Sequence, residues 1–239
     1  MKRGRPAQFK PPRPAMKKKT KSSNVGAGVG YQAGRAMAAQ PKQELKAFDT
    51  PVTAVTAQAI AGPPTFQTLN LMVNGAELYQ RVGRKCYMKS LHFRGIIQPV
   101  GAANETYLRL IIYYDSNPNG ANNTIQDLLQ DSNAAAATTF QSEINLFNRE
   151  RFQILRDYPF IGGSSTNIAG ATEIVPDPIK NSCNIDFFIP LKGLESVYNA
   201  VNGGTIADIQ TGALKYVFFG DANAIGYELI SHSRVRYYD

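Results

Sequence analysis

Cysteine, histidine and long apolar runs are all scarce in this chain of 239 residues, and each scarcity excludes a class of protein. The two cysteines, Cys86 and Cys183, cannot form the disulfide framework of a small secreted domain. Both lie in apolar, strand-like stretches, so we expect buried thiols in a reducing compartment. Only two histidines accompany them, so a Cys/His zinc site is not expected. No apolar run reaches the length of a membrane-spanning helix, so we expect no insertion into a membrane.

Acidic residues are almost absent from the first 46 residues. This stretch contains 12 of the 26 Lys and Arg residues but only one of the 18 acidic residues, Glu44. The formal charge of +8 therefore divides into about +11 on an N-terminal arm and about −3 on the body. A polycationic arm on a nearly neutral body is typical of a protein that binds a polyanion while its body folds independently.

The arm, residues 1–43, is predicted to be disordered. Its first half combines four prolines with many like charges, and residues 22–41 are rich in Gly, Ala and Ser, as in a flexible linker. Lys and Arg neutralise phosphates without fixed structure, and Phe9 and Tyr31 are too few to stack bases, so we expect binding without sequence specificity. The candidate nucleic-acid-binding residues are Lys2, Arg3, Arg5, Lys10, Arg13, Lys17, Lys18, Lys19, Lys21 and Arg35.

Four of these lysines carry a second interpretation. Lys17, Lys18, Lys19 and Lys21 satisfy the loose pattern of a nuclear-import signal, which would recruit an import receptor through the same charges. A tail that only solvates or sorts the protein is the plainer alternative.

Residues 44–239 are predicted to form one all-β domain. Period-two alternation of apolar and polar residues, rich in β-branched and aromatic side chains, predicts eight strands. These are 47–57, 84–98, 106–115, 151–160, 182–191, 196–201, 212–220 and 227–238, while 66–73 is ambiguous. One short helix is expected, capped by Thr124 with Asp127 three residues on, and with Ile125, Leu128 and Leu129 facing the core. Strands joined by long, uneven loops favour an eight-stranded antiparallel jelly roll built from two sheets.

The alternation also predicts which side chains share a face. Residues 217–219 form a continuous apolar run, which indicates a strand covered on both faces. In 84–98, one face is expected to hold Tyr87, Leu91, Phe93 and Ile97, interrupted by Lys89. In 151–160, the shared face is expected to hold Phe152, Ile154 and Tyr158.

Three motifs suggest chemistry but have simpler explanations. Asp115, Asn117 and Asn119 match the start of a calcium loop, yet Gln126 stands where the bidentate Glu is needed, so a turn is expected. The Gly28-Val-Gly30 pattern follows a lysine-rich segment rather than a strand, so a linker is expected instead of a dinucleotide site. His92 and His232 form no His-x-His pair, and we expect no catalytic residues, no metal and no cofactor.

An ordered set of segments across residues 80–157 resembles one protein family. Residues 148–157, Asn-Arg-Glu-Arg-Phe-Gln-Ile-Leu-Arg-Asp, resemble a segment in the capsid proteins of small circular single-stranded DNA viruses, the circovirus-like and satellite-virus-like group. The strand, turn and short helix over 111–129 resemble the region that precedes it there, and residues 81–95 resemble an earlier strand. The region after residue 160 is similar only in being rich in strands.

The resemblance implies a single jelly roll with its strands in two facing four-stranded sheets. It also implies a capsid protein that assembles into a small icosahedral (T=1) shell, with sixty identical copies and with the arms directed at a packaged single-stranded DNA genome. It implies a location in the virion and, during assembly, in the host nucleus. Loops 116–147 and 161–180 would be candidate regions for an unknown host-cell receptor. Two other functions remain open: a cellular nucleic-acid-binding β-sandwich module, and a jelly-roll enzyme with a basic targeting tail.

Overall fold

The computed structural model describes residues 44–60, 62, 64–100, 106–130, 138–162, 182–200, 203–221 and 226–239. These residues form β1 (Lys46–Thr56), β2 (Gln58–Ala59), β3 (Phe66–Thr68), β4 (Lys85–Pro99), β5 (Thr106–Asp115), α1 (Ile125–Leu128), η1 (Leu146–Asn148), β6 (Phe152–Gly162), β7 (Cys183–Tyr198), η2 (Ile206–Asp208), β8 (Ile209–Thr211), β9 (Ala213–Gly220) and β10 (Tyr227–Tyr238). No helix within these residues is both long and apolar enough to cross a membrane.

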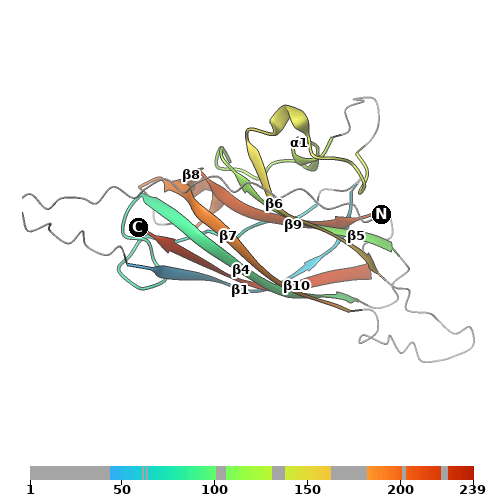
Figure 1. The fold of residues 1–239 in the computed structure, drawn as a ribbon, viewed down its shortest axis with the longest axis horizontal. Helices are drawn as coiled ribbons and strands as arrows, with labels where there is room; N and C mark the ends of the chain where they lie inside the picture. Colours follow the sequence, from blue (N-terminus) through green and yellow to red (C-terminus); the bar gives the residue numbers. More distant parts are fainter. Residues whose placement is uncertain are drawn as a thin grey trace, which may run out of the picture. The chain divides into compact units, whose positions relative to one another are not determined.

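The strands form two facing sheets (Figure 1). Sheet A has the order β1-β10-β4-β7-β8, and sheet B has the order β2-β9-β5-β6, with β3 beside β9. All pairings are antiparallel except the short parallel contact of β2 with β9. The chain crosses repeatedly between the sheets, so most neighbours in a sheet are not consecutive in the chain. This is the connectivity of a jelly roll, and the predicted fold class is confirmed.

Each sheet carries more than the four strands expected. The short β8 pairs with β7 at the edge of sheet A, and the ambiguous segment 66–73 supplies only β3. The separate strand predicted at 196–201 was wrong, because β7 continues without a break through Tyr198. The predicted strands that correspond to β1, β4, β5, β6, β9 and β10 agree with them to within two residues, whereas the strand predicted at 182–191 ends well before β7, which continues to Tyr198.

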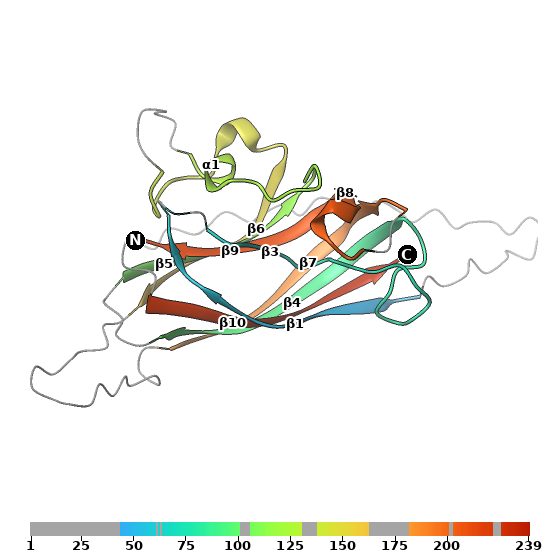
Figure 2. The same cartoon turned by 180° about the vertical axis from the view of Figure 1, so that it is seen from behind.

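The main core lies between the sheets, and a second core lies on the outer side of sheet B. Leu108, Leu110 and Ile112 of β5 point into the main core, while Ile111 and Tyr113 point into the second. Every residue of β9 is buried, which confirms the prediction that this strand is covered on both faces. The cover is the segment between β5 and β6, which includes α1 (Figures 1 and 2).

Two register shifts overturn the predicted faces of β4 and β6. The pairing of β4 with β7 shifts between Met88 and Ser90, so Tyr87 and Lys89 lie on the outer face while Leu91 and Phe93 are buried. Such a bulge reverses the alternation, because one extra residue moves each following side chain to the other face.

The same effect separates the side chains that were expected to align on β6. Ile112 of β5 pairs with Arg156, but the next residue, Tyr113, pairs with Ile154, so Leu155 is left without a partner in the register. Phe152 and Ile154 consequently belong to the outer core, whereas Tyr158 packs against the core between the sheets.

The helix prediction is confirmed in its details. The Thr124 side chain accepts from the Asp127 amide at 3.3 Å, and the Asp127 carboxylate accepts from the Thr124 amide at 2.8 Å. Ile125 and Leu128 are buried beneath this capping box. Of the two cysteines, Cys86 is fully buried, as expected, but Cys183 is only partly buried, and both are free thiols.

Candidate nucleic-acid interface

The predicted phosphate-binding and import residues lie outside the described part of the chain. This applies to Lys2, Arg3, Arg5, Lys10, Arg13, Lys17, Lys18, Lys19, Lys21 and Arg35, and to the Gly28-Val-Gly30 pattern. Most of the loop 161–180 is likewise outside it. The described residues contain a different candidate surface for binding nucleic acid, because the outer faces of the two sheets differ.

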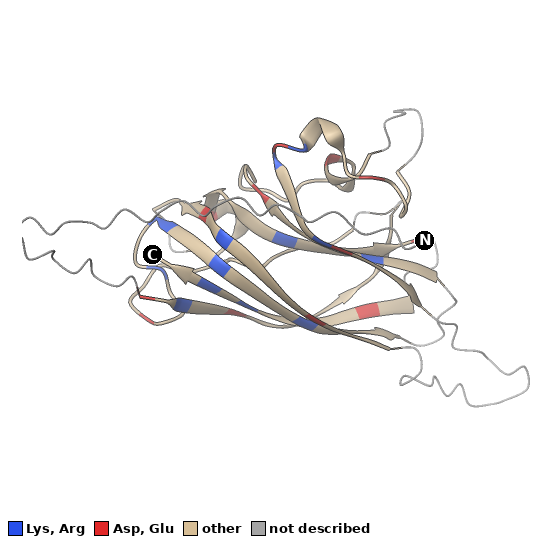
Figure 3. Cartoon of the chain, viewed as in Figure 1, with Lys and Arg blue, Asp and Glu red and all other residues tan. Residues whose placement is uncertain are grey.

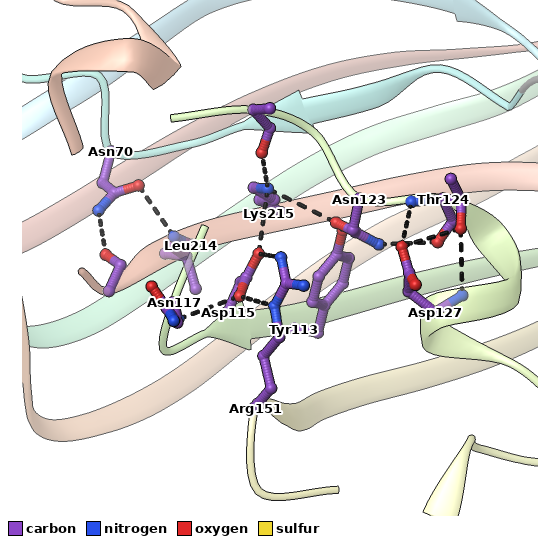
Figure 4. A network of polar contacts seen from close by, with 12 residues as sticks. Asn70, Tyr113, Asp115, Asn117, Asn123, Thr124, Asp127, Arg151, Leu214 and Lys215 are labelled. Atoms are coloured by element: carbon purple, nitrogen blue, oxygen red, sulfur yellow. Dashed lines mark hydrogen bonds and ion pairs between the residues drawn. The ribbon is translucent and has the colours of Figure 1, made fainter. Parts of the chain in front are cut away.

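The outer face of sheet B is held under the segment 116–151 by a buried charged network (Figure 4). Arg151 donates to both carboxylate oxygens of Asp115, at 2.8 and 3.1 Å. Lys215 lies 3.3 Å from the same carboxylate and donates to the Ala121 carbonyl at 3.2 Å. Tyr113 donates to Asn123 at 2.7 Å. These contacts join β5, β9 and both ends of the covering segment.

Electrostatics explain how a lysine can be buried at this point. Burial lowers the pKa of the Lys215 ammonium, and the Asp115 carboxylate opposes that change by favouring the charged form. The hydrogen bond to Asp115 raises the pKa of Arg151 above its ordinary value. The carboxylate of Asp115 is therefore occupied by two cations, which gives this residue of the calcium-like motif a structural role.

A second arginine, Arg109, binds the part of the covering segment around Phe140 and Ser142. Arg109 of β5 donates to both oxygens of Asp157 and, through Nη1, to the carbonyls of Phe140 and Ser142 at 2.9 and 2.8 Å. The described parts of the segment, residues 116–130 and 138–151, are thus both anchored to sheet B, and they cover its outer face.

The outer face of sheet A, in contrast, presents basic side chains to solvent. Lys and Arg residues recur along β4 and β10 (Figure 3), whereas β7 contains a single one, Lys192. Because cross-strand partners lie side by side, the register arranges the outward side chains in three rows. The first row is Phe188, His92, Arg234 and Asp49; the second is Asp186, Arg94 and His232; the third is Pro190, Ser90, Arg236 and Ala47.

Two acids on this face each neutralise part of the basic charge. Asp49 accepts two hydrogen bonds from Arg234, both at 2.6 Å, and these lower the pKa of its carboxyl group. Asp186 lies 2.7 Å from His92 Nε2 and 3.4 Å from Arg94, and the hydrogen bond with His92 is the main cause of its lowered pKa. Within the described residues, Arg236 has no hydrogen-bonding or ion-pair partner.

A hollow of about 170 Å³ lies at the centre of this face. It is lined by Arg94, Arg234 and Arg236, by both histidines, and by Ser90 and Phe188. The structure therefore brings together His92 and His232, which sequence reasoning placed on strands without relating them. Three arginines are the most numerous neighbours of the two histidines, and this composition suits an anion.

This basic face was missed at the level of the sequence, although a signal was present. Ser90-x-His92-x-Arg94 and His232-x-Arg234-x-Arg236 each place basic residues at period two within a predicted strand. The pattern shows that these side chains share the solvent face of their own strands. It does not show that β4 and β10 are neighbours, since they are more than 120 residues apart in the chain.

Comparisons with known structures find remote likenesses, which include two viral structures. The chain is similar to a structure of Desmodium yellow mottle tymovirus, with 13% identity, a TM-score of 0.32, and coverage of 98% of this chain and 96% of the other. It is also similar to the VP2 subviral particle of infectious bursal disease virus, with 10% identity, a TM-score of 0.24, and coverage of 88% of this chain and 40% of the other. No family model and no curated protein matches. The resemblance to capsid proteins of single-stranded DNA viruses therefore stays a prediction.

Proposed function

We propose that this chain is a viral capsid protein that assembles with copies of itself into a shell and packages nucleic acid. The observation that carries the proposal is the division of charge and structure. A lysine- and arginine-rich arm of 43 residues precedes β1, at the edge of a jelly roll whose outer face on sheet A is itself basic. The jelly roll is a fold that viral capsid domains use.

The two cationic elements are joined to the same sheet. The arm leads into β1, and β1 is the edge strand beside β10, which carries Arg234 and Arg236. In this proposal, both cationic elements bind the same ligand, a polyanion. Nucleic acid would neutralise both sets of charges and would offset the mutual repulsion of arms brought together in a shell.

Contacts between copies are supported by apolar side chains that the body leaves exposed. Leu78, Tyr79 and Val82 are more than half exposed in the segment between β3 and β4. Arg81, buried among them, donates to the carbonyls of Met72 and Gly83 and stacks on Tyr198, so the segment is held rigidly. A rigid exposed apolar cluster is suited to burial against another subunit.

The finer assignments belong to the same proposal. The family resemblance and the arm sequence support a shell of sixty copies, a single-stranded DNA cargo, a host receptor, and nuclear import through Lys17, Lys18, Lys19 and Lys21. A cellular nucleic-acid-binding module of the same fold would share the arm and the basic face, but it would be a monomer or dimer.

The test compares wild type with a full-length variant in which the nine Lys and Arg of residues 2–21 are replaced by Gln. Wild type is expected to elute from a sizing column in the megadalton range with the absorbance ratio of a nucleoprotein. The variant is expected to keep the circular dichroism of the folded body but to lose the 260 nm excess. A wild-type protein that elutes as a monomer without nucleic acid would overturn the proposal.

A further inference from the structure

The hollow on the outer face of sheet A has a composition that the shell function alone does not require. Ser90 is small and lies between Arg236 on β10 and Pro190 on β7, so the outer surface is recessed there. Three arginines and two histidines line the recess, and a volume of about 170 Å³ exceeds that of several water molecules. The recess therefore has room for a phosphate group and several cationic donors to bind it.

Arginine is the side chain best suited to this ligand. Its planar guanidinium donates two parallel hydrogen bonds to phosphate oxygens, which a lysine ammonium does not. Arg94 and Arg234 are already partly neutralised by Asp186 and Asp49. Arg236, which has no partner within the described residues, keeps its full donor capacity. We therefore place the phosphate on the Arg236 side of the recess.

Phe188 is the second unusual feature of this face. Phe188 is an apolar residue that is nevertheless 65% exposed, and the residues around it are polar. It is the cross-strand partner of His92, and the centroids of the two rings are 6.3 Å apart in an edge-on contact. That contact fixes the ring at the border of the recess while its surface remains accessible. An exposed aromatic ring beside cationic groups is the arrangement with which proteins bind unpaired bases.

We propose that the recess and Phe188 together bind one segment of single-stranded nucleic acid, with a phosphate at Arg236 and a base stacked on Phe188. β7 and β10 flank β4, and Phe188 and Arg236 are offset by two residues along the strands, so their backbone positions stand about 12 Å apart, within the reach of one nucleotide or two adjacent ones. A duplex can offer the phosphate but not the base, because its bases are stacked on one another. This inference rests on the proposed function and adds a preference for single strands.

Direct contact is tested by photo-crosslinking of the full-length protein to a single-stranded oligonucleotide that contains 5-iododeoxyuridine. The expected result is a crosslink in the tryptic peptide 181–192, which contains Phe188. Phe188→Ala should remove this crosslink. Phe147→Ala serves as the matched control, because Phe147 is 84% exposed but lies on the segment that covers sheet B. Crosslinks confined to peptides of the arm would overturn the proposal.

Strand preference is tested in the full-length chain with the nine arm residues of 2–21 changed to Gln, so that the body dominates binding. At fixed salt, Phe188→Ala should weaken binding of a 12-nucleotide single strand about tenfold and leave duplex binding unchanged. Phe188→Trp should restore it. Arg236→Gln should weaken binding of both, while Arg149→Gln, an exposed arginine on the covering segment, should change neither.

The possible results distinguish failure of this inference from failure of the proposed function. If Phe188→Ala has no effect and inorganic phosphate alone displaces the oligonucleotide, the recess is a simple anion site and the inference is wrong. In that case wild-type particles still contain nucleic acid, and the proposed function stands. If wild-type protein neither contains nor binds nucleic acid, the proposed function fails first.

Discussion

Lys215 on β9 and Asp115 at the end of β5 form an ion pair of 3.3 Å in which neither side chain is exposed to solvent. Asp115 is also held by Arg151, at the start of β6, so one carboxylate serves two cations from different elements. The pair closes the long segment between β5 and β6 over sheet B. Because the outer face of sheet B is covered in this way, the basic outer face of sheet A is the one that remains open to solvent.

The three charges of this network should not be equally important for stability. Asp115→Asn leaves two cations without an anion at a buried site and should cost about 3–5 kcal/mol in the free energy of unfolding. Lys215→Met keeps the Asp115–Arg151 pair and removes a desolvated ammonium. It should therefore lower the free energy of unfolding by less than about half of the amount expected for Asp115→Asn. Urea unfolding monitored by circular dichroism measures both. Equal losses would contradict the central position of Asp115.

Gly212, between β8 and β9, should tolerate no side chain. Its φ is +78°, and a Cβ would lie 2.0 Å from the carbonyl oxygen of Glu195. Gly212→Ala should therefore destabilise the fold by several kcal/mol, beyond the 1–2 kcal/mol of the left-handed backbone alone. Gly193 is the control, since its φ is +84° but its Cβ would meet nothing within 4 Å. If Gly193→Ala costs as much, backbone strain rather than the close approach determines both values.

Stability should fall above pH 9 through Cys86. Burial raises the pKa of this thiol to about 12 in the folded protein, whereas an unfolded cysteine ionises near pH 8.5. The contribution is fully present below pH 8.5 and is lost as the pH rises toward 12, because only the unfolded chain releases its proton in that range. Between pH 7.5 and 10, wild type should lose about 2 kcal/mol more than Cys86→Ala. Parallel pH profiles for the two proteins would contradict this assignment.

Binding to nucleic acid should depend steeply on salt. Each phosphate contact to a single strand contributes a slope of about −0.7 in a plot of log K against log salt. Replacing the nine Lys and Arg of residues 2–21 should reduce the slope by several units, and Arg236→Gln should reduce it by less than one. Fluorescence anisotropy at several salt concentrations measures these slopes. A wild-type slope close to zero would contradict phosphate binding by the arm.

The sequence predicted elements where local pattern and tertiary packing agree. The capping box at Thr124 and Asp127, the doubly buried β9 and the bounds of β5 all follow from local chemistry, and the structure contains them. The faces of β4 and β6 were assigned wrongly because a single shifted register moves the following side chains, and periodicity cannot reveal such a shift.

The candidate site was less accessible to sequence reasoning than the fold. Arg236, Ser90 and Phe188 come from three strands, and only the order β10-β4-β7 makes them neighbours. Lys215 lies two residues before the apolar run 217–219, but its partner Asp115 is 100 residues away, so the sequence does not relate the two. Chemistry that depends on non-local pairing is therefore the part that required coordinates.

Electron microscopy of the purified full-length protein tests the central claim most directly. The account predicts closed, uniform spherical particles with density inside the shell, and loss of that internal density when the nine basic residues of 2–21 are replaced by Gln. A field of single domains or dimers at the same protein concentration, with no closed particles under any salt or pH tried, would contradict it.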